Sequence, residues 1–408
     1  MSASGFDVTA FRTQFPSLAS GIAHFDGPGG TQTPYAVGAA IAATLTGPLS
    51  NRGTTGLSET NADAAVMQFR AAYADFLGVP ERGVVYGRSA TELTYHFART
   101  LSALWRPGDE VVVSRLDHDA NVSPWLQVAA RAGVLVRWLD FDPATSEILW
   151  ESVESAISER TRLVAITGAS NLIGTIPAVA AIAAKAHAVG ALVWVDGVHL
   201  AAHRFTDVGA LGADFFVCSP YKFLGPHCAV VGADPALLES LTPDKLLPST
   251  DAVPERFELG TLPYELLAGA TAAVDVLASA AGGAGVSAGS RRARLAESWT
   301  AIHDHETAMT AMIEAGLADL GDRVAVHSRA AERTPTLLVT FPGRASWDAY
   351  QFLSARGIQA PAGSFYAYEP FRRLGLADTH ALRIGVAPYT DDSDVSRLLD
   401  GLRAFVES

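Results

Sequence analysis

The sequence predicts an α/β fold with a large domain around a mostly parallel central sheet and a smaller α+β C-terminal domain. From about residue 60 to 235, helix-like segments alternate with short runs rich in β-branched and apolar residues. These runs are apolar at consecutive positions, as is typical of strands that helices cover on both faces. An Ala/Gly/Ser-rich segment at 278–290 then separates this pattern from a different one.

The elements of the large domain follow from this alternation. The expected helices are 61–77, 91–104, 122–133, 150–158 and 178–190. The expected strands are 84–86, 110–114, 134–139, 163–167, 191–196 and 214–218. Crossover helices between such strands make neighbouring strands parallel, and ligands then bind beyond the carboxyl ends of the strands.

The C-terminal part has longer helices and fewer strands. A helix is expected to begin near residue 262, followed by a long helix at 291–320. Beyond it we expect a strand at 336–341, a helix at 346–356, a loop through 370, a strand at 381–386 and a helix at 391–406. The predicted boundaries are 16–285 for the large domain, with 1–15 and 286–408 forming the small domain.

Composition excludes several classes of protein. The 408 residues carry a net charge of -13, which disfavours nonspecific binding to nucleic acids or anionic membranes. The sequence has no apolar run of about 18 residues, so no membrane span is expected. The first residues lack the pattern of a secretory signal, and Cys218 and Cys228 both lie in apolar surroundings. We therefore expect a protein of the reducing cytoplasm without disulfides.

Two residues at the predicted strand ends point to a specific cofactor. Asp196 ends the expected strand 191–196, and Lys222 follows the strand 214–218 in a turn of small residues. A lysine amine forms a Schiff base with the aldehyde of pyridoxal 5'-phosphate (PLP), and an aspartate pairs with its pyridine nitrogen. The alternative is a solvated lysine and an aspartate that forms a turn.

Other strand ends offer partners for the remaining parts of PLP. At the junction of strand and helix before Thr91, free backbone N–H groups and the threonine hydroxyl suit a phosphate, although an ordinary helix cap has the same pattern. His118 follows strand 110–114 and could stack on the pyridine ring and move a proton. Either Asn171 or His199 could donate to the phenolic oxygen of the cofactor.

Arg383 lies inside an apolar strand of the small domain. Its planar guanidinium matches the carboxylate of an amino-acid substrate, whereas an arginine on an edge strand would face water. A metal site is the rival interpretation, since Asp196, His199 and His203 have spacings found in metal-binding helices. The segment lacks the glutamate of the zinc-protease motif and a cysteine pair, so we expect no metal.

Taken together and in this order, the motifs resemble the class V aminotransferase family of fold-type I PLP enzymes, and within it the cysteine desulfurase-like group. The resemblance covers nearly the whole chain. Segments 24–30, 89–92 and 117–121 are similar to the family's YLDNAA, GTTE and EHHAN elements. The later segments 170–174, 196–199, 219–222 and 257–261 resemble SNVLG, DGAQ, SGHK and FEAGT, with His199 in place of the glutamine.

The resemblance implies a homodimeric enzyme with roles for particular residues. Lys222 would carry the Schiff base, Asp196 would pair with the ring nitrogen and His118 would stack on the ring. Arg383 would bind the substrate carboxylate, and Thr261 would reach the phosphate in the neighbouring subunit. The remaining cofactor-binding residues implied are Ala90, Thr91, Asn171, His199 and Ser219.

One loop departs from the desulfurase pattern. Those enzymes carry a nucleophilic cysteine on a small-domain loop, and the corresponding residues 363–369 contain Tyr366 where the cysteine is expected. We expect Tyr366, with Phe365 and Tyr368, to form an aromatic wall that contacts the substrate, although a loop packed onto its own domain would have the same sequence. A phenol cannot accept sulfane sulfur, and both cysteines lie in segments predicted to be buried. We therefore expect a C–S (β-) lyase or a transaminase that acts on an amino acid. The alternatives are a desulfurase that uses an external thiol, an epimerase, or a PLP-fold protein that binds without turnover.

Overall fold

The large domain is built on a twisted sheet whose strands all point the same way except one. The computed structural model describes residues 6–282, 289–376, 378 and 380–408. Within these residues the large sheet has seven strands in the order β2-β8-β7-β6-β5-β3-β4. Pairs β7/β6, β6/β5, β5/β3 and β3/β4 are parallel, and β8 runs antiparallel to both of its neighbours, β7 and β2.

The bounds of the elements agree closely with the sequence pattern in this region. The strands are β2 (Val84–Gly87), β3 (Glu110–Ser114), β4 (Leu135–Leu139), β5 (Thr161–Thr167), β6 (Leu192–Asp196), β7 (Phe215–Cys218) and β8 (Ala229–Ala233). The helices are α1 (Val8–Arg12), α2 (Tyr35–Thr46), α3 (Leu57–Leu77), α4 (Ala90–Ser102), α5 (Ser123–Ala132), α6 (Trp150–Ala156), α7 (Val179–Ala188), α8 (Pro235–Ser240) and α9 (Tyr264–Ala278).

Helices cover both faces of this sheet, which explains its apolar strands. Residues of α3, α7 and α9 pack against one face, and residues of α4 and α5 pack against the other. Strands β2, β3, β7 and β8 are buried along their whole length. Strand β4 is the exception, because it lies at the sheet edge and Leu135 is 46% exposed.

The small domain has its own sheet and its own apolar core. Strands β12 (Ala362–Gly363), β13 (Ala381–Gly385), β10 (Thr336–Thr340) and β9 (Ala325–Val326) form an antiparallel sheet in that order. Strands β1 (Ala23–His24) and β11 (Ile358–Gln359) form a separate parallel pair. The helices are α10 (Arg291–Ala318), α11 (Ser346–Ser354), α12 (Tyr368–Leu374) and α13 (Asp392–Glu407).

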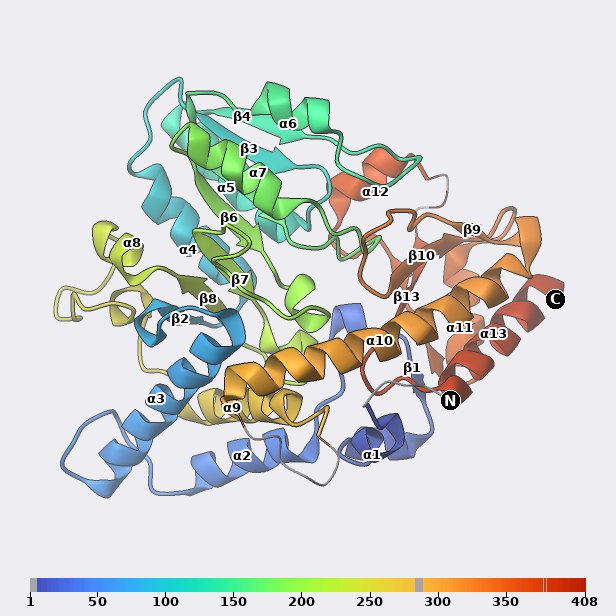
Figure 1. Ribbon diagram of the computed structural model, residues 1–408, viewed down its shortest axis with the longest axis horizontal. Coiled ribbons are helices and arrows are strands. Elements are labelled where there is room, and N and C mark those ends of the chain that lie inside the picture. The colour runs from blue at the N-terminus through green and yellow to red at the C-terminus, as the bar shows by residue number, and fades with distance from the viewer. Residues whose placement is uncertain (1–5, 283–288, 377, 379) are drawn as a thin grey trace.

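Helix α10 connects the two cores. Figure 1 shows it running from beside α9 toward α11 and α13. Its first half supplies Trp299 and Ile302 to the large-domain core, and its second half supplies Met309 and Ile313 to the small-domain core.

Several features differ from the expectations. Strand β8 and helix α2 were not anticipated, and the expected loop through residue 370 contains β11, β12 and the start of α12. The predicted boundary at residue 285 falls within 283–288, outside the described residues, so the domain limits stay a prediction. Over the part of the chain that is described, the helices include no candidate long and apolar enough to cross a membrane.

Candidate active site

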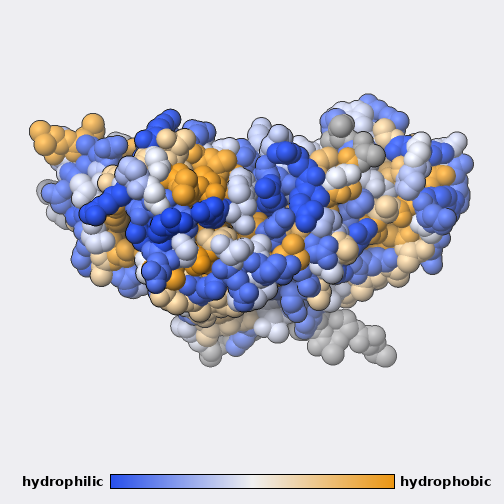
Figure 2. Space-filling model, turned by 90° about the horizontal axis from the view of Figure 1, so that it is seen from above, coloured by the Kyte–Doolittle hydropathy of each residue, from blue (hydrophilic) through white to orange (hydrophobic). Residues whose placement is uncertain are grey.

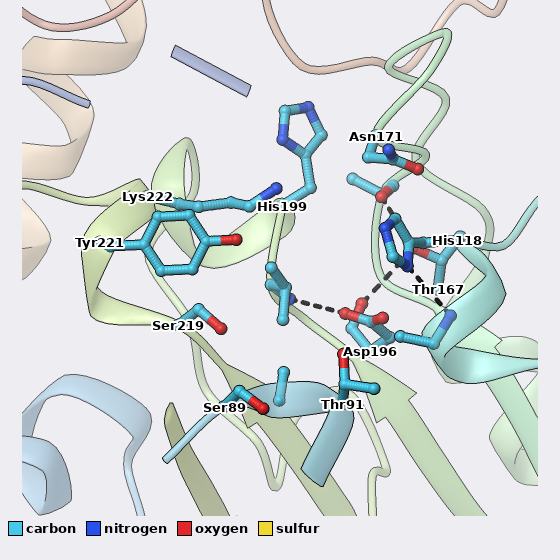
Figure 3. Close-up of a pocket in the computed structure, with 14 residues that line it drawn as sticks. Ser89, Thr91, His118, Thr167, Asn171, Asp196, His199, Ser219, Tyr221 and Lys222 are labelled. Atoms are coloured by element: carbon cyan, nitrogen blue, oxygen red, sulfur yellow. Dashed lines mark hydrogen bonds between the residues drawn. The ribbon is translucent and has the colours of Figure 1, made fainter. Parts of the chain in front are cut away.

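A pocket opens at the carboxyl ends of the parallel strands. Turns after β2, β3, β5, β6 and β7 converge there, as expected for an open α/β sheet. In Figure 3, Lys222, Tyr221 and Ser219 lie on one side of the pocket, opposite His118 and Thr167. The lining residues are Ser89, Ala90, Thr91, His118, Ala120, Thr167, Ala169, Asn171, Asp196, Val198, His199, Ser219, Tyr221 and Lys222.

Lys222 presents a buried amine to this pocket. It ends the 3₁₀ turn Pro220–Lys222 after β7, its residue is 7% exposed, and Nζ donates to the carbonyl of Pro28 at 2.6 Å. Burial, together with the nearby charge of Arg383, lowers the pKa of Lys222 to about 7, against the opposing effect of Asp196. Near neutral pH a large fraction of this amine is therefore unprotonated and nucleophilic.

Asp196 forms the floor of the pocket at the last position of β6. Its Oδ1 accepts a hydrogen bond from the backbone N–H of Val198 at 3.0 Å. Burial raises the pKa of Asp196, while that hydrogen bond and Lys222 lower it. The turn that follows requires glycine, because a Cβ at Gly197 would lie 1.8 Å from the ring of Phe216.

His118 lies across the pocket as a neutral imidazole. Its Nδ1 accepts a hydrogen bond from the backbone N–H of Ala120 at 3.0 Å, so the ring proton of the neutral form is on Nε2. Burial, with Lys222 and Arg383 nearby, lowers the pKa of His118 to about 4. A ring placed and protonated in this way can stack on a planar cofactor and donate from Nε2.

The turn that carries His118 is held by a buried polar network. Asn121 donates to Oδ1 of Asp117 at 2.7 Å and accepts from the indole of Trp125 at 3.0 Å. Burial raises the pKa of Asp117 well above its ordinary value. These contacts hold the turn after β3 in place. They also explain why polar residues follow β3 although the surrounding layer is apolar.

The N-terminus of α4 forms the lower end of the pocket in Figure 3. Ser89 caps the helix, since its side chain accepts from the N–H of Glu92 at 3.1 Å, so the ordinary capping interpretation holds for this residue. Ala90 and Thr91 of the first helical turn line the pocket. Free N–H groups and the helix dipole at this point suit a phosphate, with Ser219 on the facing wall.

Asn171 and His199 occupy the upper wall. Asn171 donates through Nδ2 to the carbonyl of Phe365 at 3.0 Å, and its Oδ1 has no hydrogen-bond partner among the described residues. Nε2 of His199 lies 2.9 Å from Oγ1 of Thr334 and 3.0 Å from Oγ1 of Thr336. Nδ1 of His199 is buried and unpaired within the same part of the chain.

Arg383 does not line the pocket directly but lies beside it, in the central strand β13. The residue is 4% exposed, so the alternative of an edge arginine facing water is wrong. Its Nη1 donates to the carbonyl of Asn171 at 2.8 Å, and its guanidinium lies 3.8 Å from the ring centre of Phe365. Burial lowers the pKa of Arg383 to about 9, and this charge has no carboxylate in direct contact among the described residues.

Besides Arg383, two more residues named from the sequence do not line the pocket of this chain. The ring of Tyr366 is 5.6 Å from that of His118, but the residue is 77% exposed and does not line the cavity. Thr261 is exposed in the loop before α9. Its predicted contact with a neighbouring subunit therefore stays a prediction.

Six lining residues were not selected from the sequence, and two of them, Tyr221 and Thr167, bring a hydroxyl group to the pocket from a position next to a predicted site residue or at a strand end. Figure 3 shows the phenol of Tyr221 pointing into the pocket between Lys222 and Ser219. Its place next to Lys222 in a turn was the available signal. Thr167 ends β5, and the same rule that selected Asp196 at the end of β6 would have selected it.

The two cysteines are both buried away from the pocket lining. Burial raises the pKa of Cys218 well above its ordinary value and that of Cys228 to about 12. Neither thiol is available as a thiolate near neutral pH, as expected from their apolar surroundings.

The side chains that line the pocket determine whether it can hold a metal ion or a cofactor. A search of the described residues gives no cluster of three or more potential metal ligands. A buried amine, an acidic floor, an anion-binding helix end and the unpaired Nδ1 of His199 match the aldehyde, pyridine, phosphate and phenolic oxygen of PLP, whereas the donor Nδ2 of Asn171 is used by the carbonyl of Phe365. The residues present therefore fit this cofactor.

Comparison with known proteins gives a family and several relatives. The family model described as Aminotransferase class-V matches residues 23–398. An uncharacterized protein of Mycobacterium tuberculosis is 31% identical, with 97% of this chain and 98% of that protein covered. A probable cysteine desulfurase of Pseudomonas aeruginosa is 30% identical, covering 97% and 98% of the two chains.

Solved structures show the same fold. The crystal structure of the cysteine desulfurase CsdA from Escherichia coli has a TM-score of 0.85 at 26% identity, covering 98% of this chain and 99% of the other. An apo cysteine desulfurase from Thermococcus onnurineus has a TM-score of 0.87 at 22% identity, with both chains covered completely. A third structure, a mutant of C-DES with glycine covalently linked to the PLP cofactor, has a TM-score of 0.77 at 20% identity, over 96% and 98% of the chains.

Proposed function

The chain belongs to the aminotransferase class-V family and is a PLP-dependent enzyme, and from this premise we propose that it eliminates a group from Cβ of an amino acid or transfers its amino group. The observation that carries the proposal is the buried amine of Lys222, with a pKa lowered to about 7, above the acidic floor made by Asp196. Such an amine is suited to bond the aldehyde of PLP and then to act as a base.

The residues around the pocket would each serve a different part of the reaction. When bound, PLP holds the amino group of the substrate and draws electrons away from Cα. Asp196 would pair with the pyridine nitrogen, and its burial favours keeping a proton between the two atoms. His118 would cover the pyridine ring. Lys222 would take the proton from Cα of the substrate, and the atom to which it returns the proton would determine the product.

The cofactor phosphate and the substrate carboxylate would lie at opposite ends of this arrangement. Ala90, Thr91 and Ser219 would hold the phosphate at the start of α4. Arg383 would bind the carboxylate, because its guanidinium is buried beside Asn171 with its Nε unpaired among the described residues. A substrate carboxylate would therefore replace a missing countercharge.

The small-domain loop favours elimination or transamination over desulfuration. Several relatives are cysteine desulfurases or probable ones, including the Escherichia coli protein, which is 28% identical over 98% of each chain. In this chain residues 363–369 contain no thiol, and Cys218 and Cys228 are buried with raised pKa values. Transfer of sulfur to the enzyme would have no acceptor, so desulfuration would need an external thiol.

The expected assembly is a homodimer in which Thr261 reaches the phosphate site of the partner. Exposed apolar side chains support such an interface. Leu259 is 50% exposed next to Thr261, and Leu247 is 96% exposed in the loop after α8. Figure 2 shows hydrophobic atoms protruding at its left end, on the side where Figure 1 places that loop. The cytoplasm stays the expected location, supported by two free buried cysteines.

The first experiment is incubation of the PLP-loaded protein with L-cysteine and a reductant, followed by identification of the carbon product. Pyruvate, formed with sulfide and ammonia, would establish a C–S lyase. Alanine would establish desulfuration with an external thiol and overturn the argument from Tyr366. With neither product, a panel of larger amino acids would be tested for exchange of the Cα hydrogen in D₂O. Exchange of the Cα hydrogen would indicate transamination or epimerisation. If no amino acid of the panel shows this exchange, the protein binds without turnover.

A further inference from the structure

A second hollow, which we call the α10 groove, lies between the middle of helix α10 and the segment 331–335 that leads into β10. Its lining also includes Arg204 from the segment after β6, so the large domain, α10 and the small domain all contribute to it. Among the described residues, the lining of this groove shares no member with that of the pocket that contains Lys222. The groove is therefore distinct from the candidate active site.

The α10 groove carries charged side chains of both signs. Its cations are Arg204 and Arg333, and its carboxyl groups belong to Glu306, Glu314 and Glu332. Arg333 and Glu314 form an ion pair with each other. The remaining three side chains are not joined to one another by any ion pair in the described part of the chain, so the groove contains charges of opposite sign that do not meet.

Arg204 is a half-buried cation without a carboxylate partner among the described residues. Its Nη1 lies 2.7 Å from Nδ1 of His303, and its Nη2 donates to the carbonyl of Arg333 at 3.1 Å. Burial and the charge of Arg204 lower the pKa of His303, which favours the neutral imidazole as the partner. Burial also lowers the pKa of Arg204, as expected for a cation whose charge is not neutralised.

Two carboxyl groups lie in the groove without a basic group that neutralises them fully. Glu332 is exposed in the segment before β10, and its side chain takes part in no ion pair within the described ranges. Glu306 is buried, with Oε2 at 3.0 Å from Nδ1 of His203 and with Oε1 lacking a hydrogen-bond partner there. Against the larger effect of burial, both residues raise the pKa of Arg204, although neither contacts it.

This arrangement restricts the chemical class of a ligand. A metal ion does not fit, because the described residues include no cluster of three or more potential metal ligands. The carboxylates repel a simple anion, and the arginines repel a simple cation. A small molecule that carries both a carboxylate and an ammonium group fits both kinds of charge, since each of its groups forms a charge-assisted hydrogen bond with a side chain of opposite sign.

We propose that the α10 groove is a second binding site, for a zwitterionic α-amino acid, whose carboxylate binds Arg204 and whose ammonium group binds Glu332. The unpaired oxygen of Glu306 adds an acceptor to the same hollow. The proposal goes beyond the proposed function. It does not depend on PLP, because the residues assigned to the cofactor all lie outside the groove.

The α10 groove and the cofactor pocket are separated by a single layer of side chains. Thr334 lines the groove, and its Oγ1 lies 2.9 Å from Nε2 of His199, which lines the pocket. An amino acid in the groove would therefore lie next to the active site without occupying it. We expect the two sites to bind amino acids at the same time.

The main test measures the binding of the standard L-amino acids by isothermal titration calorimetry. The protein is loaded with PLP and reduced with borohydride, so that the bond between Lys222 and the cofactor can no longer exchange with an amino acid. We expect at least one amino acid to bind with a dissociation constant below about 10 mM and a stoichiometry of about one. Absence of binding across the whole set would overturn the proposal.

Variants then locate the bound amino acid. Glu332→Gln and Arg204→Gln should each weaken binding at least about tenfold, because each removes one charged contact with the ligand. Glu159→Gln is the matched control, since Glu159 is an exposed glutamate before β5 and outside the groove, and it should change the dissociation constant by less than about twofold.

Equal affinities for E332Q and the unchanged protein would overturn the proposal, and so would an equal loss in E159Q. Because Glu332 is exposed, E332Q decides the question even if the Arg204 variant fails to fold. Binding that is lost in Arg383→Lys instead would assign the amino acid to the active site and overturn the proposal as well.

Two smaller probes test whether the ligand needs both charges. Acetate has only the carboxylate and methylamine only the ammonium group, and each should bind at least about tenfold more weakly than the amino acid. Equal binding of either probe would overturn the assignment of a zwitterion. If the protein shows no visible band with PLP, the proposed function fails instead, and the same titrations with the apo-protein still decide whether the groove binds an amino acid.

Discussion

The floor of the pocket and the small-domain loop that faces it are built in opposite ways. The floor consists of strand ends and short turns, where Asp196 and Lys222 are buried and hydrogen bonded. The loop carries two successive non-glycine residues in the left-handed region, Phe365 at φ 56° and Tyr366 at φ 55°, and Tyr366 is 77% exposed. The difference indicates that the floor of the pocket is a rigid frame, while the loop exposes side chains that sequence change can alter without disturbing that frame.

The loop is nevertheless fixed to the large domain at a few points. Its Phe365 and Tyr366 carbonyls accept hydrogen bonds from Asn171 Nδ2 at 3.0 Å and from the N–H of Asp119 at 2.8 Å. These contacts offset the conformational cost of the left-handed residues, which is about 1 kcal/mol each. The loop is thus positioned by backbone contacts, and its side chains are free to differ from those of relatives.

The largest effect should come from the floor. Lys222→Ala should abolish covalent attachment of PLP and lower kcat by about 1000-fold or more, since both the attached amine and the base are lost. The visible absorbance band and borohydride trapping followed by peptide mapping would measure this. Lys245→Ala is the control, because Lys245 pairs with Asp251 outside the pocket. A visible band that persists in the Lys222 variant would place the attachment elsewhere.

Arg383 lies beside both the floor of the pocket and the small-domain loop, so a substitution there tests to which of the two regions it belongs. Arg383→Lys keeps the charge but loses the planar fork, and we expect kcat/KM to fall about 100-fold, mainly through KM. The cofactor band should be unchanged, because Arg383 does not line the PLP pocket. Loss of PLP binding in this variant would show that the arginine belongs to the floor and would weaken the comparison.

The pH dependence of cofactor attachment follows from Lys222. The free amine attacks the aldehyde, and burial places its pKa at about 7 instead of 10.5, so the attachment rate should rise with pH and reach half its maximum near pH 7. Stopped-flow mixing of apo-protein with PLP between about pH 5.5 and 10 measures this rate. A rate that continues to rise beyond about pH 9 would mean that the amine titrates as a solvated lysine.

A smaller effect is expected for the loop. Tyr366→Ala should leave the affinity for PLP unchanged and alter kcat/KM by no more than about tenfold, because the side chain is exposed and contacts only the edge of the site. Tyr368→Ala, also exposed, is the matched control on the same loop. A marked loss of PLP binding in the Tyr366 variant would contradict the division between floor and loop.

The smallest effect on activity should follow removal of a cysteine. Cys228→Ala should leave kcat within about twofold, while the free energy of unfolding falls by about 1 kcal/mol through lost packing. Urea denaturation and the product assay measure the two quantities separately. Inactivation of this variant with its fold intact would show that a buried thiol takes part in the reaction.

The sequence predicted the floor better than its surroundings. Asp196 and Lys222 were recognisable because apolar runs locate strand ends, and polar residues at strand ends meet at one edge of a parallel sheet. The direction of β8 was not predictable, since an apolar run such as Ala229–Ala233 has the same pattern in either orientation. The burial of Arg383 was not predictable either, because it depends on the strands on both sides of β13. Strand β10 is distant from Arg383 in the sequence, and β12 has only two residues.

The partners of His199 show the limit of the sequence reasoning most clearly. Thr334 and Thr336 lie 135 and 137 residues away from it along the chain and reach it through the packing of the small domain. Glu306 of α10 lies 103 residues from His203, the residue that it contacts. His203 was noticed only as a candidate metal ligand, because spacing alone does not reveal a carboxylate that approaches from another helix. Contacts between residues so far apart in the sequence depend on tertiary packing, which these sequence patterns do not determine.

Helix α10 has a consequence for how the molecule folds. It supplies Trp299 and Ile302 to one apolar core and Met309 and Ile313 to the other, so neither core is complete until the same helix has formed. The two halves should therefore lose their structure in one cooperative transition, and amides along α10 should exchange with solvent only through global opening. A destabilising substitution at either end of this helix would then lower the stability of both domains together.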